Sequence, residues 1–295
     1  MKILCTGATG GLGRSLVPRL VEQERLRVKA LAHRSPLTLD GCEEATGDLN
    51  NPESLERVTV DIDTVVHLAA LTHTNRRDDY FRVNLEGTRN LLKASVKNGV
   101  RRFVYVSSRT AHPKGGGYSE SKFQAEELVK KSGLSWVILR PAEVYGEGSP
   151  DAINKLVRWI QKFKVVPIIG NGQYRLSPVF IDDVVLAMTQ IIAMENLRGV
   201  TLTLGGPEEI SFTSLVDRIS RFLGVKRLKI FVPVLLVQCL VESVLLLKKD
   251  FLARDQIPRL LCDKLPGDDI PSDLLPYRPR KLEDGLRRFL SPGTV

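Results

Sequence analysis

Met1-Lys-Ile-Leu-Cys-Thr-Gly-Ala-Thr-Gly-Gly-Leu-Gly13 opens the chain and decides its fold. The apolar residues after Met1 predict a short strand, and Gly7, Gly10 and Gly13 follow it at intervals of three. Apolar residues then recur at helical spacing from 12 to 21, so the glycines join a strand to a helix. Glycine permits positive φ and the close approach of a phosphate, and the N–H groups at a helix start bind anions. We predict a turn that binds the pyrophosphate of a dinucleotide; the alternative is a glycine-rich turn that merely packs tightly.

The composition is typical of a folded globular protein. Of 295 residues, 43% are hydrophobic and 26% are charged, which argues against disorder and leaves ample core. The four cysteines stand far apart, so we expect no C-x-x-C motif and no metal site, and we predict reduced thiols in a cytoplasmic protein. The first strand begins at once after Met1, so no signal peptide is expected.

The net charge limits the class of partner. A charge of +9 suits an anionic ligand such as a nucleotide, or an acidic membrane surface. The basic pairs are scattered along the chain and are not gathered with aromatic residues. We therefore expect a small-molecule substrate and no nucleic acid as the partner.

Strand and helix patterns alternate through the first half of the chain. After the opening strand, further strands are predicted over 27–33, 41–49, 64–70 and 102–106, and a helix over 78–98. This alternation predicts an α/β protein with a Rossmann-type, doubly wound parallel sheet, whose ligands lie at the carboxyl edge of the strands. We expect residues 1–150 to form the dinucleotide-binding domain. Residues 151–295 should form a smaller α/β substrate-binding part that is interleaved with the first and not an independent domain.

The end of the second strand bears on the choice between NAD and NADP. An acidic residue usually stands here in NAD-specific sites and binds the ribose hydroxyls. This chain has Ala32-His33-Arg34, with no carboxylate. Because a guanidinium pairs well with a phosphate, Arg34 favours NADP over NAD. The alternative interpretation is a solvated surface arginine.

Residues behind the later strands are candidates for lining the cofactor groove. Asp48 either accepts a hydrogen bond from the adenine amino group or only starts the next turn. Ala69 and Ala70 are small enough for a cofactor to pass close by. His67 is more typical of a hydrogen-bonded core histidine than of a base. Asn84 falls among apolar neighbours, so its amide is either structural or part of an active-site hydrogen-bond network.

A possible catalytic set follows the strand over 102–106. That strand runs into Ser107-Ser108, and Tyr118-Ser-Glu-Ser-Lys122 opens a helix after a run of glycines. Tyrosine and lysine four residues apart share one helix face, and a nearby ammonium stabilises the phenolate. With Ser108 bonded to the substrate oxygen, Tyr118 and Lys122 could move a proton while a nicotinamide moves a hydride.

With these residues in place, the chain resembles the extended short-chain dehydrogenases/reductases, also called the NAD-dependent epimerase/dehydratase family. The similarity spans nearly the whole chain and rests on an ordered set of segments. The principal ones are Thr6-Gly-Ala-Thr-Gly-Gly-Leu-Gly13, Val66-His-Leu-Ala-Ala70, Asn84-Leu-Glu-Gly-Thr-Arg-Asn-Leu-Leu92, Val106-Ser-Ser108, Tyr118-Ser-Glu-Ser-Lys122, Arg140-Pro-Ala-Glu-Val-Tyr-Gly146, Val179-Phe-Ile-Asp-Asp-Val184 and Tyr277-Arg-Pro-Arg280.

The resemblance implies a role for each matching residue. Tyr118 would be the general acid/base, Lys122 would bind the nicotinamide ribose and lower the tyrosine pKa, and Ser108 would hold the substrate oxygen. Arg175 is a candidate for an anionic substrate group. The residues implied in cofactor binding are Gly7, Thr9, Gly10, Gly11, Leu12, Gly13, Arg34, Asp48, Leu49, Leu68, Ala69, Ala70, Asn84, Tyr118, Lys122 and Pro141.

One departure from the family pattern concerns the loop between Ser108 and Tyr118. Only ten positions separate these two residues, and no Val-Tyr-Gly follows the serine. Arg109 and His112 stand in the shortened loop instead. Sugar-nucleotide epimerases and dehydratases shape their active sites with this region, so the shortening puts those specific activities in doubt.

The stretch 228–247 is almost entirely apolar. We expect a helix or helix pair that packs over the substrate pocket or a partner subunit. The alternatives are a flap over a lipid-like substrate and shallow contact with a membrane surface, which would make the protein membrane-peripheral. A homodimer through two helices of the Rossmann half is an expectation of the resemblance alone.

Two functions from different classes remain. The first is an NAD(P)-dependent oxidoreductase or epimerase/dehydratase that acts on a carbonyl or hydroxyl carbon of a nucleotide sugar or a hydrophobic ketone. The second is a non-catalytic NADP(H)-binding protein that stabilises an assembly or senses redox state, similar to the accessory subunit of respiratory complex I.

Overall fold

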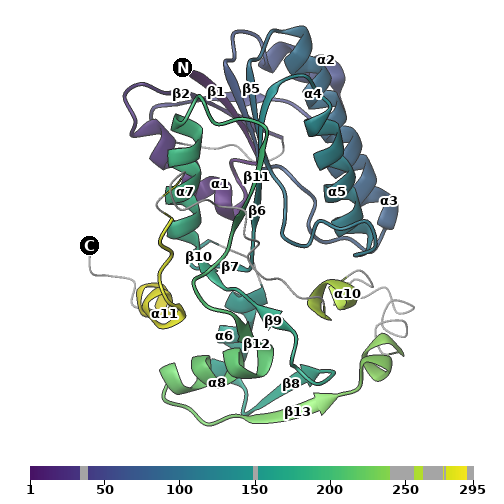
Figure 1. Ribbon diagram of the computed structural model, residues 1–295, viewed down its shortest axis with the longest axis vertical. Helices are drawn as coiled ribbons and strands as arrows, with labels where there is room; N and C mark the ends of the chain where they lie inside the picture. The colour runs from purple at the N-terminus through teal and green to yellow at the C-terminus, as the bar shows by residue number, and fades with distance from the viewer. Residues whose placement is uncertain (34–38, 149–151, 240–255, 262–274, 276, 291–295) are drawn as a thin grey trace.

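The computed structural model describes residues 1–33, 39–148, 152–239, 256–261, 275 and 277–290 (Figure 1). Its centre is a sheet of seven strands in the order β11-β6-β5-β4-β1-β2-β3, every neighbouring pair parallel. These strands are β1 (Lys2–Thr6), β2 (Arg27–Ala32), β3 (Cys42–Thr46), β4 (Thr64–His67), β5 (Arg102–Val106), β6 (Ser135–Pro141) and β11 (Val200–Leu204). The predicted doubly wound sheet is confirmed.

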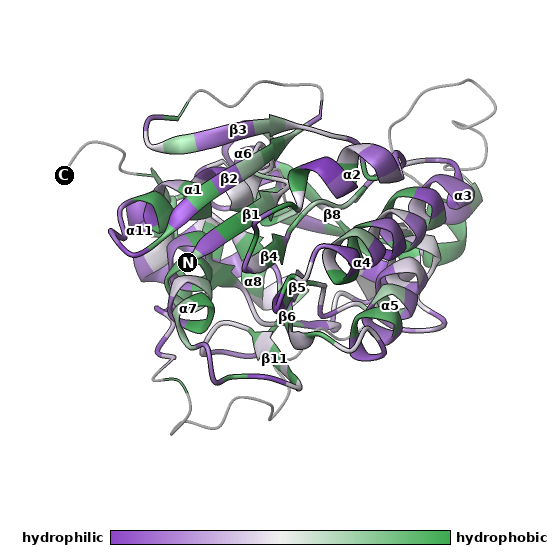
Figure 2. Cartoon of the chain, turned by 90° about the horizontal axis from the view of Figure 1, so that it is seen from above, coloured by the Kyte–Doolittle hydropathy of each residue, from purple (hydrophilic) through white to green (hydrophobic). Residues whose placement is uncertain are grey.

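Helices cover both faces of this sheet, as the view from above shows (Figure 2). On one side lie α1 (Gly11–Val21) and α7 (Ile181–Ala193), and on the other lie α2 (Pro52–Val58), α4 (Gly87–Lys97) and α5 (Gly117–Lys130). The central strands β4 and β5 are buried on both faces, which explains their nearly continuous apolar sequence. Because β1 has β2 on one side and β4 on the other, the winding of the chain reverses at β1. Ligands bind at such a switch point, beyond the carboxyl ends of the strands.

The helical stretch predicted over 78–98 is confirmed in extent, but it is not one regular α-helix. The structure divides it into α3 (Arg77–Tyr80), a π-helical segment η1 (Phe81–Glu86) and α4. The Asn84 side chain lies in η1 and bonds the backbone of Leu71, accepting from its N–H at 2.8 Å and donating to its C=O at 3.0 Å. The periodicity of the sequence does not reveal these contacts between Asn84 and the loop at Leu71. Short π-helical segments are frequently found near functional sites.

The chain after β6 contributes to the main sheet and also forms a second group of elements, which lies below the sheet in Figure 1. β11 extends the sheet beside β6, and α7 packs beside α1. The second group contains three two-stranded sheets, which pair β7 with β10, β9 with β12, and β8 with β13. Its elements are β7 (Val144–Tyr145), α6 (Ala152–Lys162), β8 (Val165–Ile169), β9 (Arg175–Leu176), β10 (Val179–Phe180), β12 (Ile210–Ser211), α8 (Phe212–Phe222), β13 (Leu228–Val232), α10 (Gln256–Leu261) and α11 (Leu282–Leu290).

The helix or helix pair expected over 228–247 is wrong for its first part. Residues 228–232 form β13, which pairs in parallel with β8, and a helical segment begins at residue 234. A short apolar run fits a strand or a helix equally well, and the partner strand that decides between them lies 63 residues earlier in the chain. Residues 240–247 lie outside the described ranges. Among the helices that the structure describes, none is long and apolar enough to cross a membrane.

Candidate active site

The glycine loop forms an anion site at the carboxyl end of β1. Gly7 has φ +72°, and its C=O accepts a hydrogen bond from the Gly10 N–H at 3.0 Å, which closes the turn. The chain then enters α1, whose first N–H groups, at Gly11, Leu12 and Gly13, have no acceptor within the helix. These N–H groups and the positive end of the helix dipole suit a pyrophosphate.

A Cβ at either end of this loop would collide with backbone. At Gly7 it would lie 2.6 Å from the Ala69 N, and at Gly13 it would lie 2.2 Å from the Gly7 O. Gly7 thus lets the segment after β4 pass close to the turn, and Gly13 lets the start of α1 pack against it. The loop therefore fits the dinucleotide that the sequence predicts.

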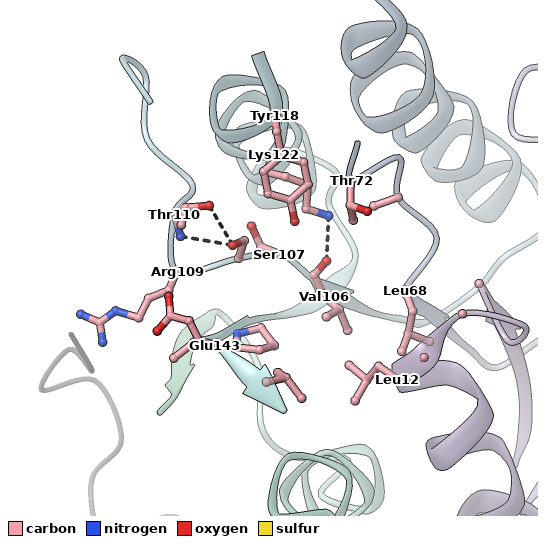
Figure 3. Close-up of a pocket in the computed structure, with 18 of the residues that line it drawn as sticks. Leu12, Leu68, Thr72, Val106, Ser107, Arg109, Thr110, Tyr118, Lys122 and Glu143 are labelled. Carbon is pink, nitrogen blue, oxygen red and sulfur yellow. Dashed lines mark hydrogen bonds between the residues drawn. The ribbon is translucent and has the colours of Figure 1, made fainter. Parts of the chain in front are cut away.

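A cavity of about 450 Å³ runs from the glycine loop past the ends of β4, β5 and β6 (Figure 3). Many of the predicted site residues meet on its wall. These are Gly7, Gly10, Gly11, Leu12, Gly13, Leu68, Ala70, Ser108, Tyr118, Lys122 and Pro141.

Lys122 projects from α5 toward the end of β5. Its Nζ donates to the Val106 C=O at 2.8 Å and lies 4.1 Å from the centre of the Tyr105 ring. Burial lowers the pKa of the Lys122 ammonium to about 7, although the Glu126 carboxylate one turn further along α5 opposes this. Glu126 is itself fully buried and bonds Arg140 through two nitrogens, at 2.9 and 2.6 Å. The amine is thus fixed in place and titrates near neutral pH in the chain without ligands.

Tyr118 lies one turn before Lys122, and both side chains reach the cavity (Figure 3). Only 7% of the residue is exposed. Its ring meets Tyr80 edge-on, with centroids 6.0 Å apart, and the Arg259 guanidinium lies 4.4 Å from the ring centre. The packing holds the ring and directs the hydroxyl toward the cavity.

Ser108 is bonded within its own loop. Its Oγ accepts the Thr110 N–H at 3.2 Å and lies 2.9 Å from the Thr110 Oγ1, where either hydroxyl could donate (Figure 3). The neighbouring Ser107 also lines the cavity, and its buried Oγ has no hydrogen-bond partner within the described part of the chain. The sequence pointed to Ser108 alone, although the Ser107-Ser108 pair was visible in it.

Comparison with known proteins agrees with this geometry. The family model for the NAD-dependent epimerase/dehydratase family matches residues 3–205, which is more than half of the chain. The chain belongs to this family. It is an enzyme of the NAD-dependent short-chain dehydrogenase/reductase type, as the sequence predicts.

Its relatives in the epimerase/dehydratase family carry more than one activity. The chain is 28% identical over 237 residues to the ceramide reductase of Caulobacter vibrioides, covering 78% of this chain and 73% of the relative. It is also 28% identical over 260 residues to the UDP-glucose 4-epimerase of Vibrio cholerae, covering 79% of each. The solved structure of MoeE5 in complex with UDP-glucose and NAD superposes with a TM-score of 0.79 at 25% identity, covering 98% of this chain and 97% of that one.

Several residues that the sequence predicts for the site are not among those that line the cavity. The Asp48 carboxylate accepts from the Asn50 N–H at 2.9 Å, which holds the pKa of Asp48 low, and pairs with His33 at 3.3 Å. The carboxylate thus stabilises the turn that follows β3, and its contact with the adenine stays a prediction. Arg175 pairs with Glu209 at 2.9 Å on β9 and is not among the residues that line the cavity.

Most of the other predicted positions form hydrogen bonds within the chain, and one lies outside the described residues. The Thr9 C=O accepts from Arg14, the Leu49 C=O accepts from Asn90, and the Ala69 N–H donates to Thr6. Asn84 is buried and bonds Leu71 and Ser121. Arg34 lies outside the described residues.

Four charged residues on the cavity wall were missed from the sequence. They are Arg109, Glu143, Lys155 and Arg259. Arg259 comes from α10, donates to the Thr72 C=O at 3.2 Å and lies over the Tyr118 ring, so the C-terminal part of the chain reaches this cavity. The sequence marks Arg109 only as part of the shortened loop and Glu143 only as part of the segment 140–146. It gives no sign that the four side chains meet, because they reach the cavity from separate segments of the fold.

His67 is a core histidine, as the sequence favours. It is fully buried at the end of β4, with Nδ1 2.6 Å from the Thr6 Oγ1 and Nε2 3.0 Å from the Thr88 Oγ1. Burial lowers the pKa of His67 to about 3, with the charge of Lys122 adding to the effect. The imidazole is therefore neutral at physiological pH and links β1, β4 and α4.

The titration of His67 predicts acid sensitivity of the fold. Between pH 6.5 and about 3 the unfolded chain binds a proton at this site and the folded chain does not, so stability falls as the pH falls through this window. Between pH 6.5 and about 3, the slope of the unfolding free energy against pH reflects the extra protons that the unfolded chain binds. We expect His67→Gln to reduce this number by nearly one. Urea unfolding at a series of pH values measures the slope, and equal slopes in the two proteins would contradict the assignment.

Proposed function

We propose that this chain is an NADP(H)-dependent oxidoreductase that acts on a carbonyl or hydroxyl carbon, with Tyr118 as the general acid/base. The observation that carries the proposal is that Tyr118 and Lys122 stand one turn apart on α5 and both line the cavity that begins at the glycine loop. The nicotinamide, when bound, supplies or accepts the hydride. Residues of the chain orient the substrate and move the proton.

Tyr118 and Lys122 divide the proton chemistry between them. In the direction of reduction the Tyr118 hydroxyl gives its proton to the substrate oxygen, and in oxidation the phenolate takes it back. One N–H of Lys122 is bound to the Val106 C=O, which leaves two for a ribose hydroxyl and for Tyr118. A negative charge beside Lys122 favours its ammonium form, and the ammonium in turn stabilises the phenolate of Tyr118.

Ser108 holds the substrate oxygen in this proposal, and Thr110 positions Ser108. The Thr110 N–H already donates to the Ser108 Oγ. If the Thr110 hydroxyl also donates, the remaining O–H of Ser108 points to a further acceptor. A substrate carbonyl oxygen next to Tyr118 would be that acceptor.

The cofactor preference rests on the end of β2. No carboxylate stands at Ala32-His33-Arg34, and the nearby Asp48 is bonded to Asn50 and His33. We expect Arg34→Asp to lower the affinity for NADP about tenfold or more while leaving NAD binding within a few-fold, because one charged hydrogen bond to the 2′-phosphate is lost. Fluorescence titration with both reduced nucleotides measures the ratio, and an unchanged ratio would refute the role of Arg34.

Two substrate classes fit the cavity, each favoured by a different observation. Three cations, Arg109, Lys155 and Arg259, line it beside one carboxylate, Glu143, which favours an anionic substrate such as a nucleotide sugar. The short loop between Ser108 and Tyr118 favours a hydrophobic ketone instead, and the ceramide reductase among the relatives acts on a lipid. A homodimer stays a prediction from the resemblance.

The test is to purify the protein, identify any bound nucleotide, and follow the reduced-nicotinamide absorbance with nucleotide sugars and with long-chain ketones. Net consumption of NADPH by a ketone indicates a reductase. Conversion of a nucleotide sugar without net consumption indicates an epimerase or dehydratase. A tightly held nucleotide that no substrate oxidises would favour the non-catalytic binding protein and contradict the proposal.

A further inference from the structure

Exposed apolar side chains gather at the end of the molecule built from α6, β8 and β13. Of eleven large hydrophobic residues that are exposed in the described part of the chain, eight lie there. Single exposed apolar residues are ordinary, but a gathering of this size marks an interaction site. We call seven of these residues the α6–β13 surface: Trp159, Phe163, Val165, Leu228, Ile230, Leu235 and Leu236. The eighth, Phe231, pairs with Ile168 and therefore lies on the other face of β13.

Strand register brings the central members of the α6–β13 surface together. Val165 pairs with Leu228, so their side chains lie on one face of the β8/β13 sheet, as does Ile230 two residues on. On the opposite face, Val166 and Ile168 are buried in the core.

Aromatic and aliphatic residues extend the α6–β13 surface at both ends. The Trp159 indole donates to the Val165 C=O at 2.8 Å, and its ring lies 4.5 Å from that of Phe163. Beyond the end of β13 the chain enters a helical segment (Figure 1), and Leu235 and Leu236 in this segment are 72% and 52% exposed.

The charges around this surface have one sign. Residues 152–169 and 225–239 hold seven lysines and arginines and no aspartate or glutamate. Lys229 is neutralised by Asp217 of α8. Arg158, Lys162, Lys164 and Lys226 are exposed and form no ion pair within the described part of the chain.

We propose that the α6–β13 surface docks this enzyme on the surface of a bilayer that contains anionic lipids. Tryptophan, phenylalanine and leucine insert at the level of the headgroups, while lysine and arginine stems reach the phosphates around them. Each basic residue near such a surface strengthens the binding several-fold. A second copy of the chain is disfavoured as the occupant, because its identical surface would carry the same positive charge.

The position of the surface connects it to the active site. Ala152 and Lys155, in the first half of α6, line the cavity, and Trp159 lies one turn beyond Lys155 on the same helix. One helix therefore leads from the bilayer contact to the cavity. The proposal holds whichever substrate the enzyme takes, and it goes beyond the proposed function.

The test uses the full chain and sedimentation with vesicles of phosphatidylcholine, with or without phosphatidylglycerol. We expect binding to the anionic vesicles, at least about tenfold weaker binding to the neutral ones, and a loss of binding as salt is raised. Two paired variants, Lys162→Glu with Lys164→Glu and Leu235→Ser with Leu236→Ser, should each weaken binding by about tenfold or more.

Matched control pairs carry the same changes elsewhere on the molecule. Lys93→Glu with Lys114→Glu and Val96→Ser with Leu186→Ser should bind vesicles as the unmodified chain does, because their side chains are exposed away from the α6–β13 surface. Tryptophan fluorescence gives a readout that needs no loss-of-binding variant: vesicles should shift the emission to the blue, and Trp159→Phe should remove the shift. Equal loss in test and control pairs, equal binding to neutral vesicles, no binding, or concentration-dependent dimers that the surface variants abolish would each overturn the proposal.

Discussion

Replacing Tyr118 by phenylalanine should lower kcat by about 10³-fold, the usual contribution of a general acid/base, while nucleotide affinity stays within a few-fold. The substitution removes one hydroxyl and keeps the ring between Tyr80 and Arg259, with only 7% of the residue exposed to start with. The loss should therefore appear in turnover and not in folding. Steady-state kinetics on the substrate found in the panel, together with nucleotide titration, measure both quantities.

Tyr174→Phe is the matched control for this variant. Tyr174 is also a buried tyrosine, but it stacks on Phe212 and does not line the cavity. Its hydroxyl should be dispensable for turnover. Full activity in Tyr118→Phe, or an equal loss in both variants, would remove Tyr118 from the mechanism.

Replacing Gly13 by alanine should weaken nucleotide binding by about 100-fold, since a misplacement near 1 Å at a binding loop has effects of this size. The new Cβ would lie 2.2 Å from the Gly7 O and 2.7 Å from the Ala8 Cα. Both atoms belong to backbone, so the loop must move and the N–H groups at the start of α1 move with it. Calorimetric titration with NADPH measures the affinity.

Gly99→Ala separates this effect from a general loss of stability. Gly99 follows α4 with φ +72°, so alanine there is strained by about 1 kcal/mol, but its Cβ would meet nothing within 4 Å. The variant should unfold slightly earlier and bind NADPH normally. Normal binding in Gly13→Ala would show that the loop does not hold the cofactor.

The parts of the site that the sequence predicts are those with local causes. The glycine loop needs only a strand, a turn and a helix start within one short stretch, and Tyr118 and Lys122 share a face because they stand four apart on a helix. His67 could be placed in the core because it sits within a continuous apolar strand. Each of these features depends on neighbours in the sequence.

The parts that the sequence missed depend on residues far away in the chain. Arg259 contacts the ring of Tyr118, which stands 141 positions earlier in the sequence. Asn84 lies in a π-helical segment and bonds the backbone of Leu71 in another loop. β13 is a strand only because β8 offers an edge to it. Arg175 pairs with Glu209 from another segment, and its role toward the substrate stays a prediction. Pairing between distant segments leaves little trace in local periodicity.

The central claim is that Tyr118 moves a proton in step with hydride transfer at the nicotinamide. The most direct measurement is a single-turnover reaction of the purified enzyme with NADPH deuterated at the transferable position of C4, carried out in parallel with Tyr118→Phe. The account predicts deuterium on the reacting carbon of the product in the unmodified enzyme, and a transfer slowed about 10³-fold in the variant despite bound nucleotide. Equal rates of transfer in both proteins, or no transfer in either from any substrate of the panel, would contradict it.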